Sequence, residues 1–150
     1  MNHKLKSYIL LTRLNKPIGS LLLMFPCLWG LIAACASLSD IKQNMFLFII
    51  FIFGSFVMRS AGCVINDIFD RNIDVKVERT KFRPLANKAI PLYDAILIFI
   101  TLSLIGLCIL LSLNLLSIKI GVVAFFLLII YPLTKRITHW PQLFLAITFN

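Results

Sequence analysis

Residues 45–65 read MFLFIIFIFGSFVMRSAGCVI, an apolar run in which Arg59 is the one charged residue. At about 1.5 Å per residue, a helix of this length matches the hydrocarbon core of a bilayer, which is about 30 Å thick. Apolar and polar residues do not alternate in this run as they would in a strand of a membrane barrel. We therefore expect residues 45–65 to form a helix that spans a membrane.

The rest of the chain repeats this pattern. Similar apolar runs cover residues 18–38, 95–113 and 115–133, and residues 143–150 begin another. The chain of 150 residues is 60% hydrophobic and 14% charged, whereas soluble domains are about 45–50% apolar and about 25% charged. The sequence therefore predicts an all-α membrane protein, a single domain over residues 1–150 with four transmembrane helices and a truncated fifth.

The distribution of Lys and Arg predicts the orientation in the membrane, because these residues are retained in cytoplasmic loops. Four precede residue 18, six lie in the loop at 66–94 and two follow residue 133, whereas the opposite side holds Lys42 and Lys119. We therefore expect a multi-pass protein with a cytoplasmic N-terminus and a cytoplasmic 66–94 loop. The net charge of +9 does not indicate a nucleic-acid partner, because aromatic residues do not alternate with the basic ones.

Four side chains with oxygen ligands continue the second helix beyond its apolar part. At about 100° per residue, Asn66, Asp67, Asp70 and Asp74 fall within one arc of about 100°. Mg²⁺ is commonly bound by a few carboxylates together with phosphate oxygens. This arc therefore predicts a magnesium site.

Basic side chains suited to phosphate follow the acidic arc directly. They are Arg71, Lys76, Arg79, Lys81 and Arg83. A metal-binding face beside phosphate-binding residues predicts a diphosphate site at the membrane surface. The alternative is a solvated loop whose basic residues only set the topology.

Arg59 lies within an apolar span, where a charged residue is costly and indicates a functional site. It precedes Asn66 by seven residues and Asp70 by eleven, so that all three share one helix face. We expect Arg59 to bind the same diphosphate. The alternative is a structural pairing with an Asp or a carbonyl group.

Lys135 and Arg136 lie on the same predicted side of the membrane as the 66–94 loop. They follow Tyr131 and Pro132, at which we expect the fourth helix to end. They are candidates for binding the diphosphate, and the alternative is that they only anchor the topology.

Several motifs together resemble one known family. The segment NDIFDRNID at 66–74 resembles the first aspartate-rich motif, NDxxDxxxD, of the UbiA family of intramembrane prenyltransferases. Other segments resemble the branch of that family that prenylates 4-hydroxybenzoate. They are RLNKPIG at 13–19, PCLW at 26–29, RSAGCVI at 59–65, RTKFRPL at 79–85, YPLTKR at 131–136 and WPQ at 140–142.

The resemblance implies Mg²⁺-dependent transfer of a polyprenyl group from polyprenyl diphosphate to 4-hydroxybenzoate, in ubiquinone biosynthesis. It implies a bacterial inner membrane or the equivalent mitochondrial membrane. The implied roles are Mg²⁺ binding by Asn66, Asp67, Asp70 and Asp74, catalysis by Asp70, Asp74, Arg71 and Arg136, and diphosphate binding by Lys76, Arg79, Arg83, Lys135 and Arg59.

The chain departs from the family pattern after its fourth apolar run. The family forms a nine-helix bundle with a second aspartate-rich motif, whereas here Asp94 is the last acidic residue. We therefore expect the N-terminal half of such an enzyme. Three alternatives stay open: an inactive fragment or a half that needs a separately encoded C-terminal half, a relative acting on a naphthoate or on haem or chlorophyll precursors, and a small transporter or scaffold.

Overall fold

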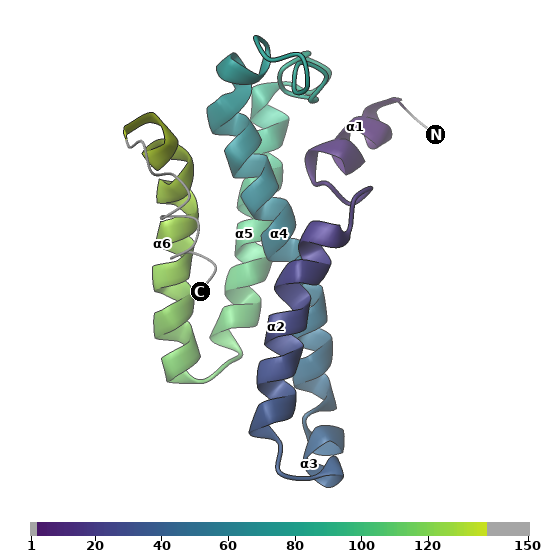
Figure 1. Ribbon diagram of the computed structural model, residues 1–150, viewed down its shortest axis with the longest axis vertical. Helices are drawn as coiled ribbons and strands as arrows, with labels where there is room; N and C mark the ends of the chain where they lie inside the picture. Colours follow the sequence, from purple (N-terminus) through teal and green to yellow (C-terminus); the bar gives the residue numbers. More distant parts are fainter. Residues whose placement is uncertain (1–2, 138–150) are drawn as a thin grey trace.

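The computed structural model describes the backbone of residues 3–137 and the side chains of residues 4–130. Over this range it is all-helical, as the sequence predicts, and no strand is present. The helices are α1 (His3–Leu11), α2 (Ile18–Ala34), α3 (Leu38–Gln43), α4 (Met45–Asp74), α5 (Leu92–Leu111) and α6 (Leu115–Ile137). In Figure 1, α1 and the segment 75–91 lie at one end of a bundle of long helices, and α3 lies at the other end.

The helix α4 is the centre of the bundle and contacts α1, α2, α3, α5 and α6. Both α4 and α5 are long and apolar enough to cross a membrane, and α2 and residues 115–130 are shorter apolar helices. Large apolar side chains of α5 remain exposed in the described part of the chain, among them Leu97, Ile100 and Leu104. Exposed apolar surface of this extent is typical of a membrane protein, in which such side chains contact lipid.

Two helices continue beyond the apolar runs predicted for them. The helix α4 extends through the whole acidic motif to Asp74, as expected from the arc of oxygen ligands. The helix α6 continues through Pro132 to Ile137, so the prediction that it ends at Tyr131 and Pro132 is wrong. Membrane helices tolerate proline because neighbouring groups can satisfy the freed carbonyl. The predicted fifth helix at 143–150 lies outside the described residues.

The predicted connection at 39–44 contains the short helix α3, which the sequence analysis did not expect. The Ser37 side chain accepts a hydrogen bond from the Asp40 N–H, and the Asp40 carboxylate accepts one from the Ser37 N–H at 3.2 Å. This capping box satisfies two N–H groups that the helix cannot satisfy itself. It explains why a turn of helix forms in so short a connection.

The segment 75–91 packs onto the end of the bundle through its apolar residues. Its Leu85 and Ile90 are 8% and 3% exposed and belong to a core with Leu11, Val64 and Ala95. This core therefore joins α1, α4, α5 and the segment 75–91. The Thr80 hydroxyl also donates a hydrogen bond to the Asp74 carbonyl at 3.1 Å, which holds the chain against the end of α4. These contacts determine where the basic residues of the segment lie.

Candidate functional site

A buried carboxylate lies at the centre of the polar end of the bundle. Asp67 is 2% exposed, and its two oxygens accept hydrogen bonds from Arg13 Nη2 at 3.4 and 3.3 Å. Arg83 Nη1 donates a third hydrogen bond to Asp67 at 3.0 Å. Burial of a lone carboxylate would cost several kcal/mol. The two guanidinium groups offset part of this cost, and burial still raises the pKa of Asp67 above its ordinary value.

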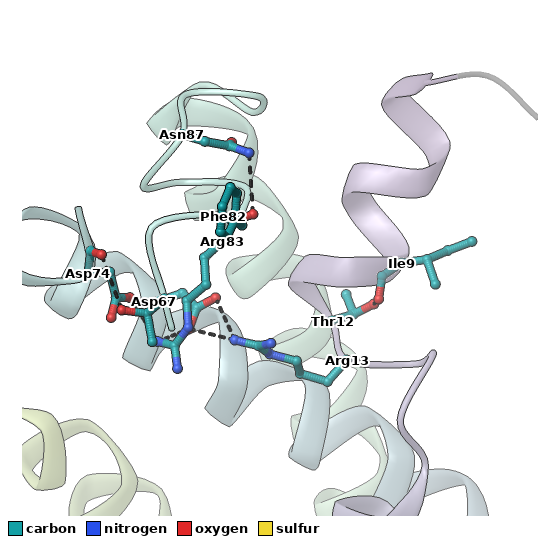
Figure 2. A network of polar contacts seen from close by, with 9 residues as sticks. Ile9, Thr12, Arg13, Asp67, Asp74, Phe82, Arg83 and Asn87 are labelled. Atoms are coloured by element: carbon teal, nitrogen blue, oxygen red, sulfur yellow. Dashed lines mark hydrogen bonds and ion pairs between the residues drawn. The ribbon is translucent and has the colours of Figure 1, made fainter. Parts of the chain in front are cut away.

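Arg83 also connects Asp67 to the last residue of α4. The same Nη1 atom lies 2.8 Å from Asp74 Oδ2, and Figure 2 shows this guanidinium between the two carboxylates. Asp67 and Asp74 are seven residues apart and therefore share a face of α4. We call these four residues, Arg13, Asp67, Arg83 and Asp74, the arginine–aspartate network.

The network joins three segments that are distant in sequence. Arg13 follows α1, where its φ of 59° turns the chain, and the Thr12 hydroxyl donates to the Tyr8 carbonyl at 2.9 Å. Arg83 comes from the segment 75–91, which the apolar core holds against α1 and α4. A left-handed conformation at a residue other than glycine costs about 1–2 kcal/mol. Arg13, the residue in this conformation, forms the ion pair with Asp67.

Among the side chains that the structure describes, the other predicted phosphate-binding residues form no ion pair with the network. Arg71 donates a hydrogen bond to the Ile68 carbonyl of its own helix at 2.8 Å, and Lys81 pairs with Glu78 at 2.6 Å. Lys76 and Arg79 are exposed. The side chains of Lys135 and Arg136 lie outside the described part. Arg83 is the predicted phosphate-binding residue that forms ion pairs with Asp67 and Asp74 in the described part.

The predicted magnesium ligands separate into two pairs in the structure. Asp67 and Asp74 bind Arg83, whereas Asn66 and Asp70 lie about one turn apart on α4 and are half-buried. Residues 4–130 contain no group of three His, Cys, Asp or Glu side chains arranged to hold a metal. Mg²⁺ is often held by one or two carboxylates, with phosphate oxygens and water completing its shell. Asn66 and Asp70 fit a site of that kind.

Arg59 forms none of the ion pairs of the network and lies at the contact between α4 and α2. A Cβ atom built on Gly19 would lie 2.5 Å from Arg59 Nε and 2.8 Å from Nη2. The guanidinium therefore packs directly on the backbone of the first turn of α2. None of the ion pairs among the described residues involves Arg59.

A second polar contact links α1 to the start of α5. The Tyr8 hydroxyl donates to Asp94 Oδ2 at 2.7 Å, and this hydrogen bond to a carboxylate raises the pKa of the Tyr8 phenol. Both residues line an open apolar groove of about 480 Å³ between the two helices, together with Leu5 and Leu97. The groove contains none of the predicted site residues, and we assign it no part in the chemistry.

Sequence reasoning missed the contributions of Arg13, Gly19 and Tyr8. Arg13 counted only toward the topology, and its proximity to Asp67 depends on how α1 folds back on α4. One signal was available, because Arg13 and Gly19 begin and end the segment RLNKPIG, which is one of the motifs that resemble the family.

These features define a helical membrane protein with a cluster of carboxylates and guanidinium groups at one end of its bundle. Comparison with known proteins identifies its class: residues 23–150 match the model described as the UbiA prenyltransferase family. The chain belongs to this family, and the resemblance seen in its motifs is confirmed.

Curated relatives align with almost the whole chain. A 4-hydroxybenzoate octaprenyltransferase of Shewanella oneidensis is 47% identical over 150 residues, which is 100% of this chain and 51% of the relative. One of Vibrio atlanticus is 45% identical over 147 residues, which is 98% of this chain and 50% of the relative. The chain thus spans about half the length of the curated relatives it matches. No solved structure matches it.

Proposed function

We propose that this chain acts in the Mg²⁺-dependent transfer of a polyprenyl group from polyprenyl diphosphate to 4-hydroxybenzoate. The observation that carries the proposal is the polar end of α4. There, Asn66 and Asp70 lie beside Asp67 and Asp74, which bind Arg83, a residue whose guanidinium is suited to phosphate. The names of the relatives, which align with 98% to 100% of this chain, support the same reaction.

In this reaction the bond between the prenyl C1 and the diphosphate oxygen breaks, and a carbon–carbon bond forms ortho to the acceptor hydroxyl. The proton of that ring carbon then leaves. Bound Mg²⁺ would neutralise negative charge on the diphosphate, held by Asn66 and Asp70 together with the phosphate oxygens. Coordination by Asp67 or Asp74 would compete with their hydrogen bonds from Arg83 and, at Asp67, from Arg13.

Basic residues stabilise the leaving diphosphate in this proposal, because preorganised positive charge favours developing negative charge. Arg83 is the nearest candidate to the carboxylates. Arg71, Lys76 and Arg79 belong to the same end of the helix bundle. Lys135 and Arg136 complete the proposed set. The apolar helices would enclose the prenyl tail and exclude the water that quenches an allylic cation.

The proposed setting is the inner membrane of a bacterium or its mitochondrial equivalent, with the N-terminus and the segment 66–94 on the cytoplasmic side. Figure 1 supports this arrangement because α1 and the segment 75–91 lie at the same end of the bundle. A partner chain that supplies the remaining half of the relatives' length belongs to the same proposal.

The test is an assay of membranes that contain the chain, with octaprenyl diphosphate, 4-hydroxybenzoate and Mg²⁺. The chain is assayed alone and together with the second half of the Shewanella oneidensis relative, expressed separately. We expect prenylated product in at least one arrangement. Absence of product in both would refute the proposed function.

The variant Asp70→Ala tests the site itself. We expect it to abolish release of diphosphate, because it removes one of two proposed magnesium ligands. The control is Glu78→Ala, which removes an acidic side chain that is 86% exposed and pairs only with Lys81 in the described part. Turnover of Asp70→Ala equal to that of the control would contradict the metal site.

A further inference from the structure

We propose that the groove between α1 and α5 binds an acyl chain of an anionic phospholipid, whose phosphate lies against Lys4 and Lys6. The groove has a volume of about 480 Å³, which is within the range of about 300–1,000 Å³ typical of ligand sites. It contains none of the residues assigned to the diphosphate. The inference therefore goes beyond the proposed reaction and gives α1 a lipid-binding role of its own.

The lining of the groove suits a hydrocarbon chain. Its apolar side chains come from both helices and include Leu5, Ile9, Leu97 and Ile98. The Tyr8 hydroxyl donates to Asp94 Oδ2 at 2.7 Å, and the Thr12 hydroxyl donates to the Tyr8 carbonyl at 2.9 Å. Because these polar groups already form hydrogen bonds within the protein, the groove favours an apolar occupant.

Two exposed lysines flank the side of α1 that faces the groove. Leu5 lines the groove, and its neighbours Lys4 and Lys6 lie about 100° to either side of it around the helix. Neither lysine takes part in an ion pair among the described residues, and Asp40 is the first acidic residue of the chain. The lysines therefore provide a positive charge that complements a lipid phosphate.

The position of the groove along α5 matches the surface of a bilayer. The groove includes Asp94 in the first turn of α5 and continues to Leu97 in the apolar part of this helix. Tyr93 is 72% exposed, and tyrosine is enriched at the level of the lipid head groups. The end of the bundle that carries α1 (Figure 1) is the proposed cytoplasmic end, and the cytoplasmic leaflet is rich in anionic lipids.

The experiment maps lipid contacts by photocrosslinking. The chain is placed in phosphatidylcholine nanodiscs that contain increasing fractions of phosphatidylglycerol with a photoactivatable acyl chain, and mass spectrometry identifies the labelled residues. A parallel series uses phosphatidylcholine with the same photoactivatable chain. We expect phosphatidylglycerol to label the residues that line the groove, and to reach half-maximal labelling there at a lower fraction than phosphatidylcholine.

Lysine variants test the contribution of charge. One lysine near an anionic surface contributes about a fivefold preference. The double variant Lys4→Gln/Lys6→Gln should therefore raise the fraction of phosphatidylglycerol needed for half-maximal labelling of the groove by about 5- to 25-fold. The matched control Lys42→Gln/Lys119→Gln removes two exposed lysines outside α1 and should leave this fraction unchanged.

Tryptophan variants of α5 test the groove itself. Leu97→Trp should prevent labelling of the groove, because the larger side chain occupies the space of the acyl chain. Leu104→Trp is the control, since Leu104 lies two turns further along the same face of α5 and does not line the groove. The two leucines are similarly exposed, at 51% and 55%. Circular dichroism checks that all variants retain their helices.

Several results would overturn the inference. Equal half-maximal fractions for the two lipids would show contact with the bulk bilayer only, and unchanged labelling in the lysine variant or in Leu97→Trp would contradict the site. Displacement of the label by octaprenyl diphosphate would assign the groove to the prenyl tail. Loss of the label when the second half of the Shewanella oneidensis relative is co-expressed would assign the groove to that half. Prenyl transfer is assayed separately, and its absence would refute the proposed function while leaving this inference standing.

Discussion

Replacement of Arg83 by methionine removes the guanidinium that bridges two carboxylates while keeping a side chain of comparable length. Arg83 Nη1 lies 3.0 Å from Asp67 and 2.8 Å from Asp74, whose side chains are 3% and 9% exposed. Asp67 would keep Arg13, but Asp74 would lose its one ion pair among the described residues. We expect the segment 75–91 to loosen from the end of α4.

The expected magnitude follows from the burial of the two carboxylates. A hydrogen bond to a charged group contributes about 1.5–3 kcal/mol, and loss of one partner of a buried ion pair costs about 3–5 kcal/mol. Because the Arg83 side chain is itself 23% exposed, we expect the lower part of this range, about 3 kcal/mol. Arg83→Lys should recover only part of it, since an ammonium group does not reproduce the planar guanidinium.

The assay is unfolding in mixed detergent micelles, followed by the loss of helix. Its control is Lys81→Met in the same segment, which breaks the ion pair with Glu78. That pair lies on side chains that are 40% and 86% exposed, and we expect its loss to cost less than about 1 kcal/mol. Equal free energies of unfolding for the two variants would refute the reasoning. Hydrogen exchange should also increase in residues 79–91 of Arg83→Met alone.

Two further predictions concern the contacts of α1. Leu11→Ala should lower the free energy of unfolding by about 2–5 kcal/mol because Leu11 is fully buried. The control Leu5→Ala, at a side chain that is 51% exposed, should change this free energy by less than about 0.5 kcal/mol. Unfolding in micelles measures both, and equal effects would contradict the packing of α1. Asp94→Asn should lower the raised pKa of Tyr8 toward its ordinary value, as measured by alkaline titration of phenol absorbance in a chain whose other tyrosines are phenylalanine. Because the raised pKa favours the protonated phenol in the folded chain, the stability from this contact is present below the ordinary pKa and is lost as the pH rises through the raised pKa. An unchanged pKa of Tyr8 in Asp94→Asn would contradict the role of this hydrogen bond.

Much of the helical architecture follows from local sequence. The apolar run from residue 45 predicts the start of α4 at Met45, and the run from residue 18 predicts the start of α2 at Ile18. These boundaries are predictable because a long apolar segment must satisfy its backbone hydrogen bonds internally in a membrane. The helix α3 and the continuation of α6 through Pro132 were not predicted. They depend on a capping box and on the tolerance of membrane helices for proline, and a hydropathy pattern reveals neither of these.

The candidate site could be located from the sequence but not resolved into roles. Helical periodicity places Asn66, Asp67, Asp70 and Asp74 in one arc, and it treats them as equivalent ligands. In the structure, Asp67 and Asp74 instead bind Arg83. Periodicity within one helix carries no information about partners that arrive from other segments, so this division could not be foreseen.

The sequence by itself determined that this protein is a helical membrane protein of the UbiA family and that its aspartate-rich motif continues one long apolar helix. It could do so because a hydropathy pattern and a short motif are both contained in residues that are close together in the sequence. Only the tertiary structure decided which cation meets which carboxylate. The pairing of Asp67 with Arg13 spans 54 residues, and Arg59 meets Gly19 across two helices. Such contacts arise where segments fold back on α4, and their geometry is set by packing between segments.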